Sequence, residues 1–261
     1  MRALQIAATG MSAQQMRVET ISNNLANMNT SGYNARRAEF ADLHYQQAVR
    51  PGTITAADGT AVPTGVQLGL GVRPAAVTME IAQGTLELTG GELDIAIEGS
   101  GFFEVTLPAG NSGYTRDGAF KRSAEGQIVT SNGNPLVPDI TIPDDTRSVS
   151  INASGEVYGY FTGQVEPELL GQITLAGFSN TKGLEAIGGN MFVETNASGP
   201  AFVATPGEDG LGSVRQTYLE ASSVDAVREV TELIEAQRGY EMNAKIITAA
   251  DQMLGATTQI R

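Results

Sequence analysis

The segment from Met1 to Tyr33 limits the possible folds more than any other, because an apolar heptad runs through it and then stops abruptly. Two sets of residues recur every seven positions and are apolar apart from Gln14: Leu4, Met11, Val18 and Leu25, and Ala7, Gln14, Ile21 and Met28. This spacing predicts one helix over residues 3–28 with a continuous apolar stripe. The run Asn29-Thr30-Ser31-Gly32 predicts its end, because such residues compete with helical hydrogen bonds or favour a positive φ.

A second heptad lies at the far end of the chain, again with no partner nearby in sequence. Its members are Ala226, Leu233, Tyr240, Ile247 and Leu254. Ser222 followed by Asp225 resembles a capping box, and the pattern then continues to about Thr258, a helix of roughly 55 Å. We therefore expect the two ends to pair as a coiled-coil stalk on which the residues between them are inserted.

The distribution of charge favours this pairing. Residues 1–50 hold five Arg against three acidic residues, a net +2, whereas residues 220–261 hold four basic against seven acidic residues, a net −3. Opposite charges on paired helices attract each other, although each exposed pair contributes little.

Two features inside the predicted helices leave alternatives open. Asn23 and Asn24 are poor helix formers, so they either face solvent or make a packed amide contact with another helix. Gly239 costs about 1 kcal/mol relative to Ala in a helix interior. It is either a tolerated substitution or a place where a neighbouring backbone approaches closely.

Residues 46–72 are poor in large apolar side chains except for an alternating set. These residues are Val62, Val66, Leu68, Leu70 and Val72. Alternation is typical of strands, and Asp58-Gly59 is a common turn pair. We expect an extended β-ribbon that leaves the main body and turns at Asp58-Gly59.

From about Val77 to Gln216, short apolar runs alternate with turn signals, which is typical of a β-rich domain. The predicted strands are 95–97, 101–105, 127–129, 141–142, 148–151 and 172–175. The fold class is therefore α+β, with long terminal helices, a central β-rich domain and an extended ribbon. The predicted parts are 1–33 with 220–261 as a helical coiled-coil domain, 34–76 as linker and ribbon, and 77–219 as the central β-rich domain.

Composition excludes several classes of function. The formal net charge of −13 argues against general nucleic-acid binding, which requires a basic surface. The chain has no cysteine, which excludes disulfides, Cys-based zinc sites and thiol catalysis. The start of the chain lacks the charged and apolar regions of a signal peptide, and no run of residues is apolar enough to span a membrane.

Motifs for catalysis or cofactor binding are not found in the sequence. It contains no dinucleotide or phosphate-binding loop, no metalloprotease motif and no calcium loop. The acidic pairs Asp144-Asp145 and Glu92/Asp94 could suggest a glycan hydrolase, but solvated turn carboxylates explain them better. We expect no catalytic, cofactor-binding or metal-binding residue, and we expect His44, the single histidine, to be structural.

The segment from Tyr114 to Phe120 also points to structure rather than chemistry. Arg116 beside Asp117-Gly118 predicts a turn that local polar contacts fix, with an aromatic residue anchoring each flank.

Three long motifs in this order resemble the bacterial flagellar basal-body rod and hook family. They are ISNNLANMNTSGYNARRAEF at 21–40, DIAIEGSGFFEV at 94–105 with GYTRDGAFKRSAEGQIVTSNGNPLV at 113–137, and LEASSVDAVREVTELIEAQRGYEMNAKIITAADQML at 219–254. Within the family, the length and the segment 46–72 are most similar to the distal rod type. Two positions depart from the family pattern: Asn34, where Lys is frequent, and Gly239, where Ala is expected.

The resemblance implies a non-enzymatic structural subunit, exported without a cleaved signal peptide by the flagellar type III apparatus, that polymerises helically into the hollow distal rod across the periplasm. The implied partners are further copies of the chain, proximal rod and hook-side axial proteins, and the outer ring proteins that act as a bushing. No cofactor, nucleic acid or membrane insertion is implied. A hook or rod–hook junction subunit is the alternative, and a stalked surface adhesin is disfavoured because no anchor is recognised.

The residues expected to matter fall into two sets. The first would form the inner helical assembly surface: Leu4, Met11, Val18, Ile21, Leu25, Leu233, Tyr240, Ile247 and Leu254. The second would form the family motif at the end of the first helix: Asn24, Leu25, Ala26, Asn27, Asn29, Thr30, Gly32 and Tyr33.

Overall fold

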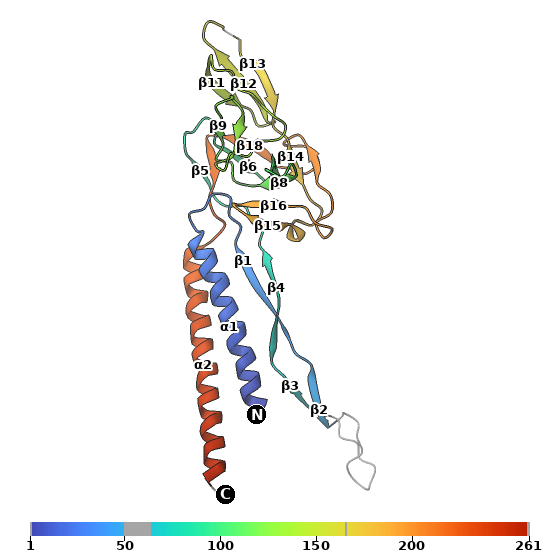
Figure 1. Cartoon of the computed structure of the whole chain (residues 1–261), viewed down its shortest axis with the longest axis vertical. Coiled ribbons are helices and arrows are strands. Elements are labelled where there is room, and N and C mark those ends of the chain that lie inside the picture. Colours follow the sequence, from blue (N-terminus) through green and yellow to red (C-terminus); the bar gives the residue numbers. More distant parts are fainter. Residues whose placement is uncertain (1, 50–63, 165, 260–261) are drawn as a thin grey trace. The chain divides into compact units, whose positions relative to one another are not determined.

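The computed structural model describes residues 2–49, 64–164 and 166–259, and the chain divides into two compact units (Figure 1). The helical unit consists of Met1–Leu25, Arg36–Thr78 and Ala226–Arg261. The β unit consists of Ala26–Ala35 and Met79–Asp225. The chain therefore passes between the units after residues 25, 35, 78 and 225.

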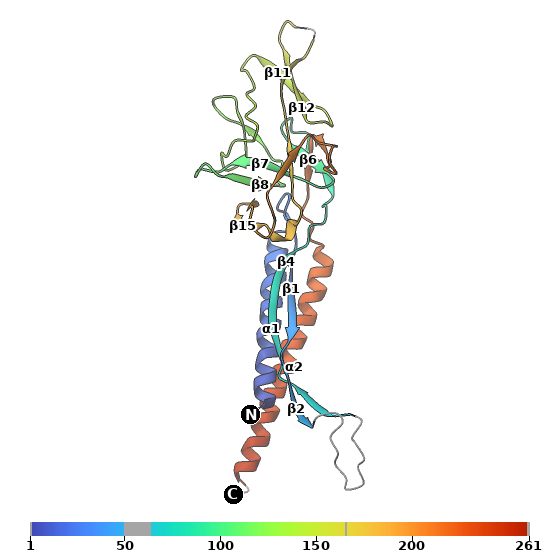
Figure 2. The same ribbon diagram turned by 90° about the vertical axis from the view of Figure 1, so that its right-hand side faces the viewer.

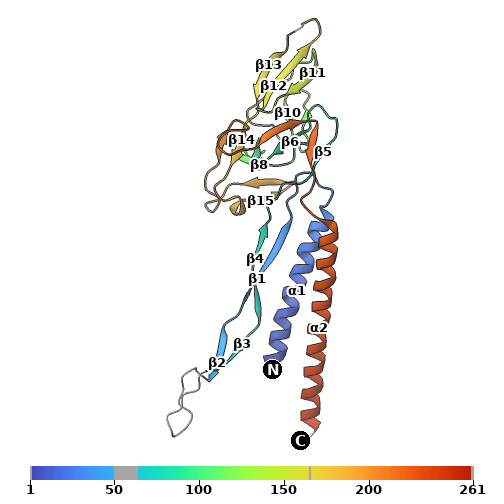
Figure 3. The same cartoon turned by 180° about the vertical axis from the view of Figure 1, so that it is seen from behind.

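One long helix lies at each end of the chain, as predicted: α1 spans Arg2–Ala26 and α2 spans Ala226–Gln259. Their 25 and 34 residues correspond to lengths of about 37 and 51 Å. The ribbon views show the two helices side by side and running in opposite directions (Figures 1 and 3). Within the described part of the chain, no helix has the length and hydropathy needed to cross a membrane.

The predicted capping box at the start of α2 is wrong. Ser222 lies four residues before Ala226, and its Oγ accepts a hydrogen bond from the Val224 N–H at 3.3 Å. Asp225 directly precedes the helix, and Asp is a favoured residue type at the N-cap. The sequence pattern therefore located the helix correctly but assigned its first turn to the wrong residue.

Two pairs of strands belong to the helical unit (Figure 2). One joins β1 (Arg36–Asp42) to β4 (Val72–Met79), and the other joins β2 (Tyr45–Val49) to β3 (Val66–Gly69) in an antiparallel arrangement. The Leu43 N–H donates to the Gly71 carbonyl at 2.8 Å, between the two pairs. The predicted turn at Asp58-Gly59, and Val62, lie outside the described residues.

The β unit confirms a central β-rich domain. Its largest sheet has the strand order β15-β16-β8-β7-β14-β17, and β11-β12-β13 form a second sheet. The remaining pairs are β6 with β18, β5 with β19, and β9 with β10. The elements are β5 (Leu86–Leu88), β6 (Ile95–Glu98), β7 (Phe102–Thr106), β8 (Ser112–Thr115), β9 (Lys121–Arg122), β10 (Ile128–Val129), β11 (Thr146–Ile151), β12 (Glu156–Phe161), β13 (Glu168–Gln172), β14 (Leu175–Gly177), η1 (Thr181–Gly183), β15 (Glu185–Gly188), β16 (Met191–Val193), β17 (Phe202–Ala204), β18 (Ser213–Gln216) and β19 (Tyr218–Glu220).

Two predicted strands differ from the structure. Residues 141–142 form only an isolated bridge, in which Thr141 pairs with Gln127. The run 172–175 divides between the end of β13 and the start of β14. The N–H of the fully buried Ile173 donates to the Gly155 carbonyl at 2.7 Å, one position beyond the Glu156–Gln172 pair of β12 and β13, so a residue distant in sequence holds the point where the run divides.

Two apolar clusters stabilise the β unit, and β7 contributes to both. Successive side chains of a strand point to opposite faces, so Phe103 enters the larger cluster and Phe102 the smaller one. The Phe103 ring meets Phe120 edge to face, with 5.1 Å between ring centroids. In the smaller cluster Tyr114 meets Phe178 at 4.8 Å. Burial, followed by the charges of nearby carboxylates, raises the pKa of Tyr114 to about 12, so this ring stays neutral at physiological pH.

Phe103→Ala should lower the free energy of unfolding of the β unit by about 3–5 kcal/mol, because it leaves a cavity in a fully buried cluster. Urea unfolding of the full chain, followed by near-UV circular dichroism, measures the loss. Leu169→Ala is the matched control, because that side chain is 54% exposed and should change stability little. Equal losses in the two variants would contradict this description of the core.

Candidate functional site

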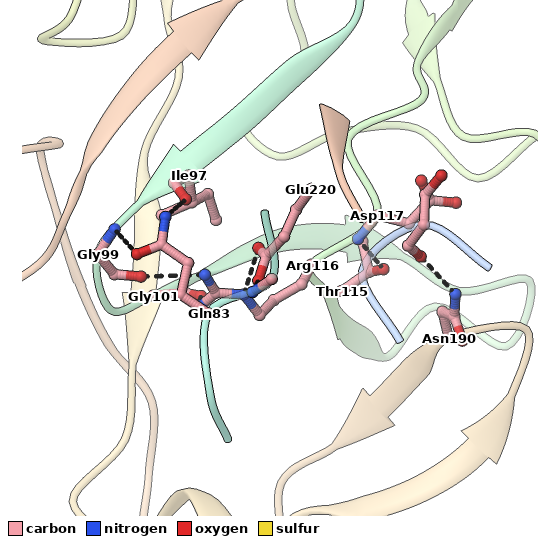
Figure 4. Close-up of polar contacts among 11 residues, drawn as sticks. Gln83, Ile97, Gly99, Gly101, Thr115, Arg116, Asp117, Asn190 and Glu220 are labelled. Atoms are coloured by element: carbon pink, nitrogen blue, oxygen red, sulfur yellow. Dashed lines mark hydrogen bonds and ion pairs between the residues drawn. The ribbon is translucent and has the colours of Figure 1, made fainter. Parts of the chain in front are cut away.

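A buried ion pair between Arg116 and Glu220 lies at the centre of the β unit's polar contacts (Figure 4). The Arg116 Nε donates to Glu220 Oε2 at 2.8 Å, and both side chains are only 3% exposed. The other guanidinium nitrogens donate to the Gly101 and Gly99 carbonyls at 3.2 and 3.0 Å. The second carboxylate oxygen of Glu220 accepts the Gly84 N–H at 2.9 Å. A buried pair is stable when its remaining hydrogen bonds are satisfied, as they are here.

Arg116 therefore has a structural role, as predicted, but its main partner is distant in sequence rather than local. The local turn is present as well: the Thr115 hydroxyl accepts the Asp117 N–H at 3.0 Å, and Asp117 accepts the Ala119 N–H at 3.1 Å. Burial raises the pKa of Asp117 and Asp94 adds to the rise, although the Ala119 hydrogen bond opposes it. The turn fixes the backbone, and the ion pair fixes the turn to β19.

The segment after α1 is fastened to this ion pair through Gly32. Its N–H donates to the Glu220 carbonyl at 2.8 Å, and its φ is +65°, which favours glycine. A Cβ at this position would lie 2.7 Å from the carbonyl carbon of Arg116. Gly32 is therefore required both by its φ and by the close approach of the Arg116 backbone.

Further hydrogen bonds hold the neighbouring positions. The Ser223 N–H donates to the Tyr33 carbonyl at 3.0 Å, and Ser223 Oγ accepts the Ala35 N–H at 2.9 Å. The Glu80 N–H donates to the Ala35 carbonyl at 2.8 Å, and Asn190 Nδ2 donates to the Ser31 carbonyl at 2.8 Å. We call this set the junction clamp: residues 31–35 with Glu80, Arg116, Asn190, Glu220 and Ser223. It joins the parts of the β unit next to the positions where the chain passes to the helical unit.

The family-motif residues take several different positions. Asn27 closes a turn, because its carbonyl accepts the Thr30 N–H at 3.1 Å and its Oδ1 accepts the Thr30 hydroxyl at 3.2 Å. Ala26 is the exposed last residue of α1, and Asn29 is also exposed. Leu25 and Tyr33 are half-buried.

Asn24 makes a second polar contact, within the helical unit. Its Nδ2 donates to the Arg36 carbonyl at 2.8 Å and its Oδ1 accepts the Arg36 N–H at 2.9 Å, as a paired strand would. The same Nδ2 donates to Glu229 on α2 at 3.2 Å. Asn24 is 1% exposed, so the packed amide contact is the correct alternative there, whereas Asn23 is exposed.

Small and polar residues form the contact between α1 and α2. A Cβ at Gly10 would lie 2.9 Å from Asn243 Nδ2, and a Cβ at Gly239 would lie 3.2 Å from Gln14 Cδ. Gln14 therefore meets Gly239, and Gly10 meets Asn243. The two helices run antiparallel, because the earlier residue of α1 contacts the later residue of α2. At Gly239 the near atoms belong to the Gln14 side chain and not to a backbone, so the close backbone approach is not found there.

Opposite charges also meet along this contact, in line with the expected attraction. Arg17 lies 3.4 Å from Glu232 and 3.6 Å from Glu235. Partial burial opposes ionisation of Glu232, but hydrogen bonds and charges from Arg228 and Arg17 outweigh it, so the pKa of Glu232 is lowered.

The buried side of α2 does not carry the heptad predicted from the sequence, which contains Leu233, Tyr240, Ile247 and Leu254. Ala236 and Ala250 are buried, and they share a heptad with Glu229 and Asn243 that lies three positions after the predicted set. Sequence reasoning missed this heptad because it searched for large apolar side chains. The two alanines, fourteen positions apart with Asn243 midway between them, were the available signal.

The predicted assembly residues are mostly half-buried, and their role stays a prediction. Ile21 is buried, Tyr240 and Leu254 are exposed, and the others are half-buried: Leu4, Met11, Val18, Leu25, Leu233 and Ile247. Val18 and Tyr240 come together in a groove of about 360 Å³ between the two helices. Its lining is Gln15, Val18, Glu19, Gln237, Tyr240 and Glu241.

The residues that might have suggested catalysis are dispersed. Asp144 forms an ion pair with Arg122 while its side chain remains 94% exposed, and His44 is exposed. In the ranges that the structure describes, no group of three His, Cys, Asp or Glu residues is placed to hold a metal ion.

Three families of known sequence match separate parts of the chain. The family described as "Flagella basal body rod protein" matches residues 4–34, "Flagellar hook protein FlgE/F/G D1 domain" matches residues 96–159, and "Flagellar basal body rod FlgEFG protein C-terminal" matches residues 215–260.

Whole-length relatives agree with these matches. The "Flagellar basal-body rod protein FlgG" of Caulobacter vibrioides is 53% identical over 100% of both chains, and that of Agrobacterium fabrum is 47% identical over 97% of both. A solved structure, the Helicobacter pylori flagellar hook protein FlgE2, matches 72% of this chain and 43% of its own at 16% identity. Its TM-score of 0.25 is too low to support any comparison of fold.

Arg116→Met and Glu220→Gln should each lower the free energy of unfolding of the β unit by about 3–5 kcal/mol, because each leaves a buried group without its partner. The double variant should lose less than the sum of the two single losses. Urea unfolding of the full chain measures all three. Arg122→Met is the control, because its ion pair is exposed and should be worth less than about 1 kcal/mol.

The helix pair should become less stable in acid. The lowered pKa of Glu232 means that its ion pairs stabilise the fold fully above the ordinary value of 4.5, and that this contribution is lost as the pH falls through the lowered pKa. Thermal unfolding can be followed by circular dichroism at 222 nm, at pH 7 and pH 3. The melting temperature should fall more between these pH values for the unsubstituted chain than for Arg17→Met. An equal fall in both would contradict the role of this contact.

Proposed function

This chain belongs to the FlgG family of flagellar basal-body rod proteins, and we propose that it is a non-enzymatic structural subunit that polymerises helically into the hollow distal rod and transmits motor torque to the hook. Identity of 53% along the whole chain supports the assignment to the distal rod.

The uncovered apolar surface of α2 is the observation that carries the proposal. Eight large apolar side chains on this helix are exposed: Val227, Val230, Ile234, Tyr240, Met242, Ile246, Met253 and Leu254, with exposed fractions from 39% to 78%. Single exposed apolar residues are normal, but a helix with apolar residues around most of its circumference is usually buried in a larger structure. Further copies of the same chain would bury these side chains in a helical polymer.

The helical unit supports a layered subunit. We infer that α1 and α2 pair as an antiparallel coiled coil that lines the inner tube, because small residues on one heptad bring them together and larger residues remain for neighbours. We also infer that β1–β4 and β2–β3 act as one extended ribbon that braces adjacent subunits. We propose the same division of the chain by role: 1–33 with 220–261 as the helical coiled-coil domain, 34–76 as linker and ribbon, and 77–219 as the central β-rich domain.

The junction clamp supports transmission of torque. Three of the four chain passages lie beside residues that hydrogen-bond one another: Tyr33 and Ala35 both bond Ser223, and Ala35 also bonds Glu80. These hydrogen bonds join segments of the β unit that are far apart in sequence and stiffen this part of it. A rod subunit that carries torque needs such stiffness, whereas a hook subunit must bend.

Membership in the family also suggests where the subunit works and with what. We propose that it contacts proximal rod and hook-side axial proteins and the outer ring proteins, crosses the periplasm as part of the rod, and reaches it through the flagellar export apparatus without a cleaved signal peptide. A hook or rod–hook junction subunit is the alternative.

Removal of residues 1–33 or 222–261 should abolish rod formation in a strain that lacks its own distal rod subunit, because each deletion removes one member of the helix pair. Electron microscopy of basal bodies measures the result, and the full chain is the positive control. Rods built by either truncated chain would contradict the proposal.

Deletion of residues 46–72 distinguishes the rod from the alternative. A rod subunit should then give bent or failed rods, because the brace between copies is lost. Normal function after this deletion would favour a flexible hook or junction role.

A further inference from the structure

The strand pair β1–β4 is fastened to α1 at two points within the helical unit. At one point, the Asn24 side chain makes two hydrogen bonds with the backbone of Arg36, at 2.8 and 2.9 Å. At the other, the Thr9 hydroxyl accepts the Val72 N–H at 3.3 Å and donates to the Ile6 carbonyl at 2.8 Å. The helix therefore holds the strand pair at both of its ends.

The two fastenings are nearly the same distance apart on the helix and on the strand. Thr9 and Asn24 are fifteen residues apart, which corresponds to about 22 Å along a helix. Arg36 and Leu43 are seven residues apart, which corresponds to about 23 Å along a strand. Leu43 lies at the second fastening, because its N–H donates to the Gly71 carbonyl at 2.8 Å. Both fastenings can therefore hold at once without bending either element.

Beyond the second fastening the chain bends, and β2 leaves the line of β1 (Figure 2). Strand pairing continues through this bend, because Leu43 bonds Gly71 and Tyr45 pairs with Gly69. We call the strand pair β2–β3 the arm. We call the bend between the arm and β1–β4 the elbow: Leu43, Tyr45, Gly69 and Gly71, with Thr9 of α1.

Gly71 is the residue that allows the elbow to lie against α1. Its φ is +117°, in a region that favours glycine. A Cβ at this position would overlap the Thr9 hydroxyl oxygen and would lie 3.3 Å from the Thr9 Cβ. Any larger residue would therefore push the chain away from Thr9 and break the hydrogen bond to the Val72 N–H.

We propose that the elbow fixes the direction of the arm within a single chain. Thr9 holds the chain at Val72, Gly71 makes the bend possible so close to the helix, and Asn24 keeps the rest of β1–β4 along α1. The inference deepens the proposed function and rests on it in one respect, the use of the arm as a brace. It assigns the direction of that brace to α1 rather than to contact between copies.

The character of the arm explains why its direction has to be fixed. β2 and β3 contain no charged residue, and Val66 and Leu68 are 50% and 45% exposed, which suits contact with a second copy. A single two-stranded ribbon is marginally stable in water, so without the elbow the arm would take many directions. An arm whose direction is fixed beforehand loses less entropy when copies meet.

Distances between spin labels test the elbow, because the chain has no cysteine of its own and two substituted cysteines define the labels. Ser12→Cys on α1 with Gln67→Cys on β3 forms the arm pair, and Ser12→Cys with Ala76→Cys on β4 forms the inner pair. All three positions are exposed. Double electron–electron resonance on the full-length monomer should give one narrow distance distribution for each pair.

Thr9→Val removes the hydroxyl and keeps the size of the side chain. The arm pair should then lose its narrow distribution and become broad, whereas the inner pair should stay narrow because Asn24 still holds the strand pair. Thr9→Ser restores the hydroxyl and should restore the narrow arm pair. Thr20→Val is the matched control, because the Thr20 hydroxyl also bonds a carbonyl of α1, that of Met16 at 2.9 Å, and it should change neither pair.

Gly71→Ala is an independent variant. The added Cβ should separate Val72 from Thr9, so the arm pair should broaden and the Val72 amide should exchange its hydrogen faster. If Thr9→Val does not fold, this variant decides in its place.

A broad arm pair in the chain with an unsubstituted elbow, or a narrow one in Thr9→Val, overturns the proposal and leaves the rod role standing. Failure of the unsubstituted chain to restore rods counts against the proposed function itself, whatever the label distances.

Discussion

The buried Arg116–Glu220 ion pair is the contact on which the organisation of the β unit depends. It joins the turn after β8 to β19, and the backbone of each partner also holds Gly32. Two charges with so little exposure are tolerated because each remaining nitrogen and oxygen of the pair makes a hydrogen bond to a backbone group. The same residues thus fix the segment that follows α1. Their contacts with Gly32 explain why the family motif has a glycine at this position.

The helix pair shows a different balance of forces. Its contact uses Gly10, Gln14, Gly239 and Asn243, which bring small and polar groups of the two helices together. Gln14 Oε1 is even buried without a hydrogen-bond partner in the described part of the chain. Large apolar side chains of α2, such as Met242 and Met253, remain exposed. Assembly with further copies would supply the burial that the single chain lacks.

Much of the fold could be predicted from local pattern. Both terminal helices, the β-rich centre and most of its strands follow from periodicity and turn residues, because these depend on neighbours in sequence. The partner of Arg116, the buried role of Asn24 and the division of the 172–175 run could not be predicted. Each depends on contacts between residues far apart in the chain, such as Arg116 with Glu220 and Ile173 with Gly155.

The sequence by itself determined that two heptad helices enclose a β-rich insert, since spacing and helix-ending residues need no tertiary information. Three long motifs also determined the family. Only the tertiary structure decided which heptad each helix turns toward the other: it chose the small residues at Ala236, Gly239 and Asn243, and left Tyr240 and Met242 uncovered. The physical reason is that two helices approach most closely where side chains are small. The segment from Met1 to Tyr33 therefore buries Ala7 and Ala13 together with Ile21, and leaves Leu4, Met11, Val18 and Leu25 half-buried.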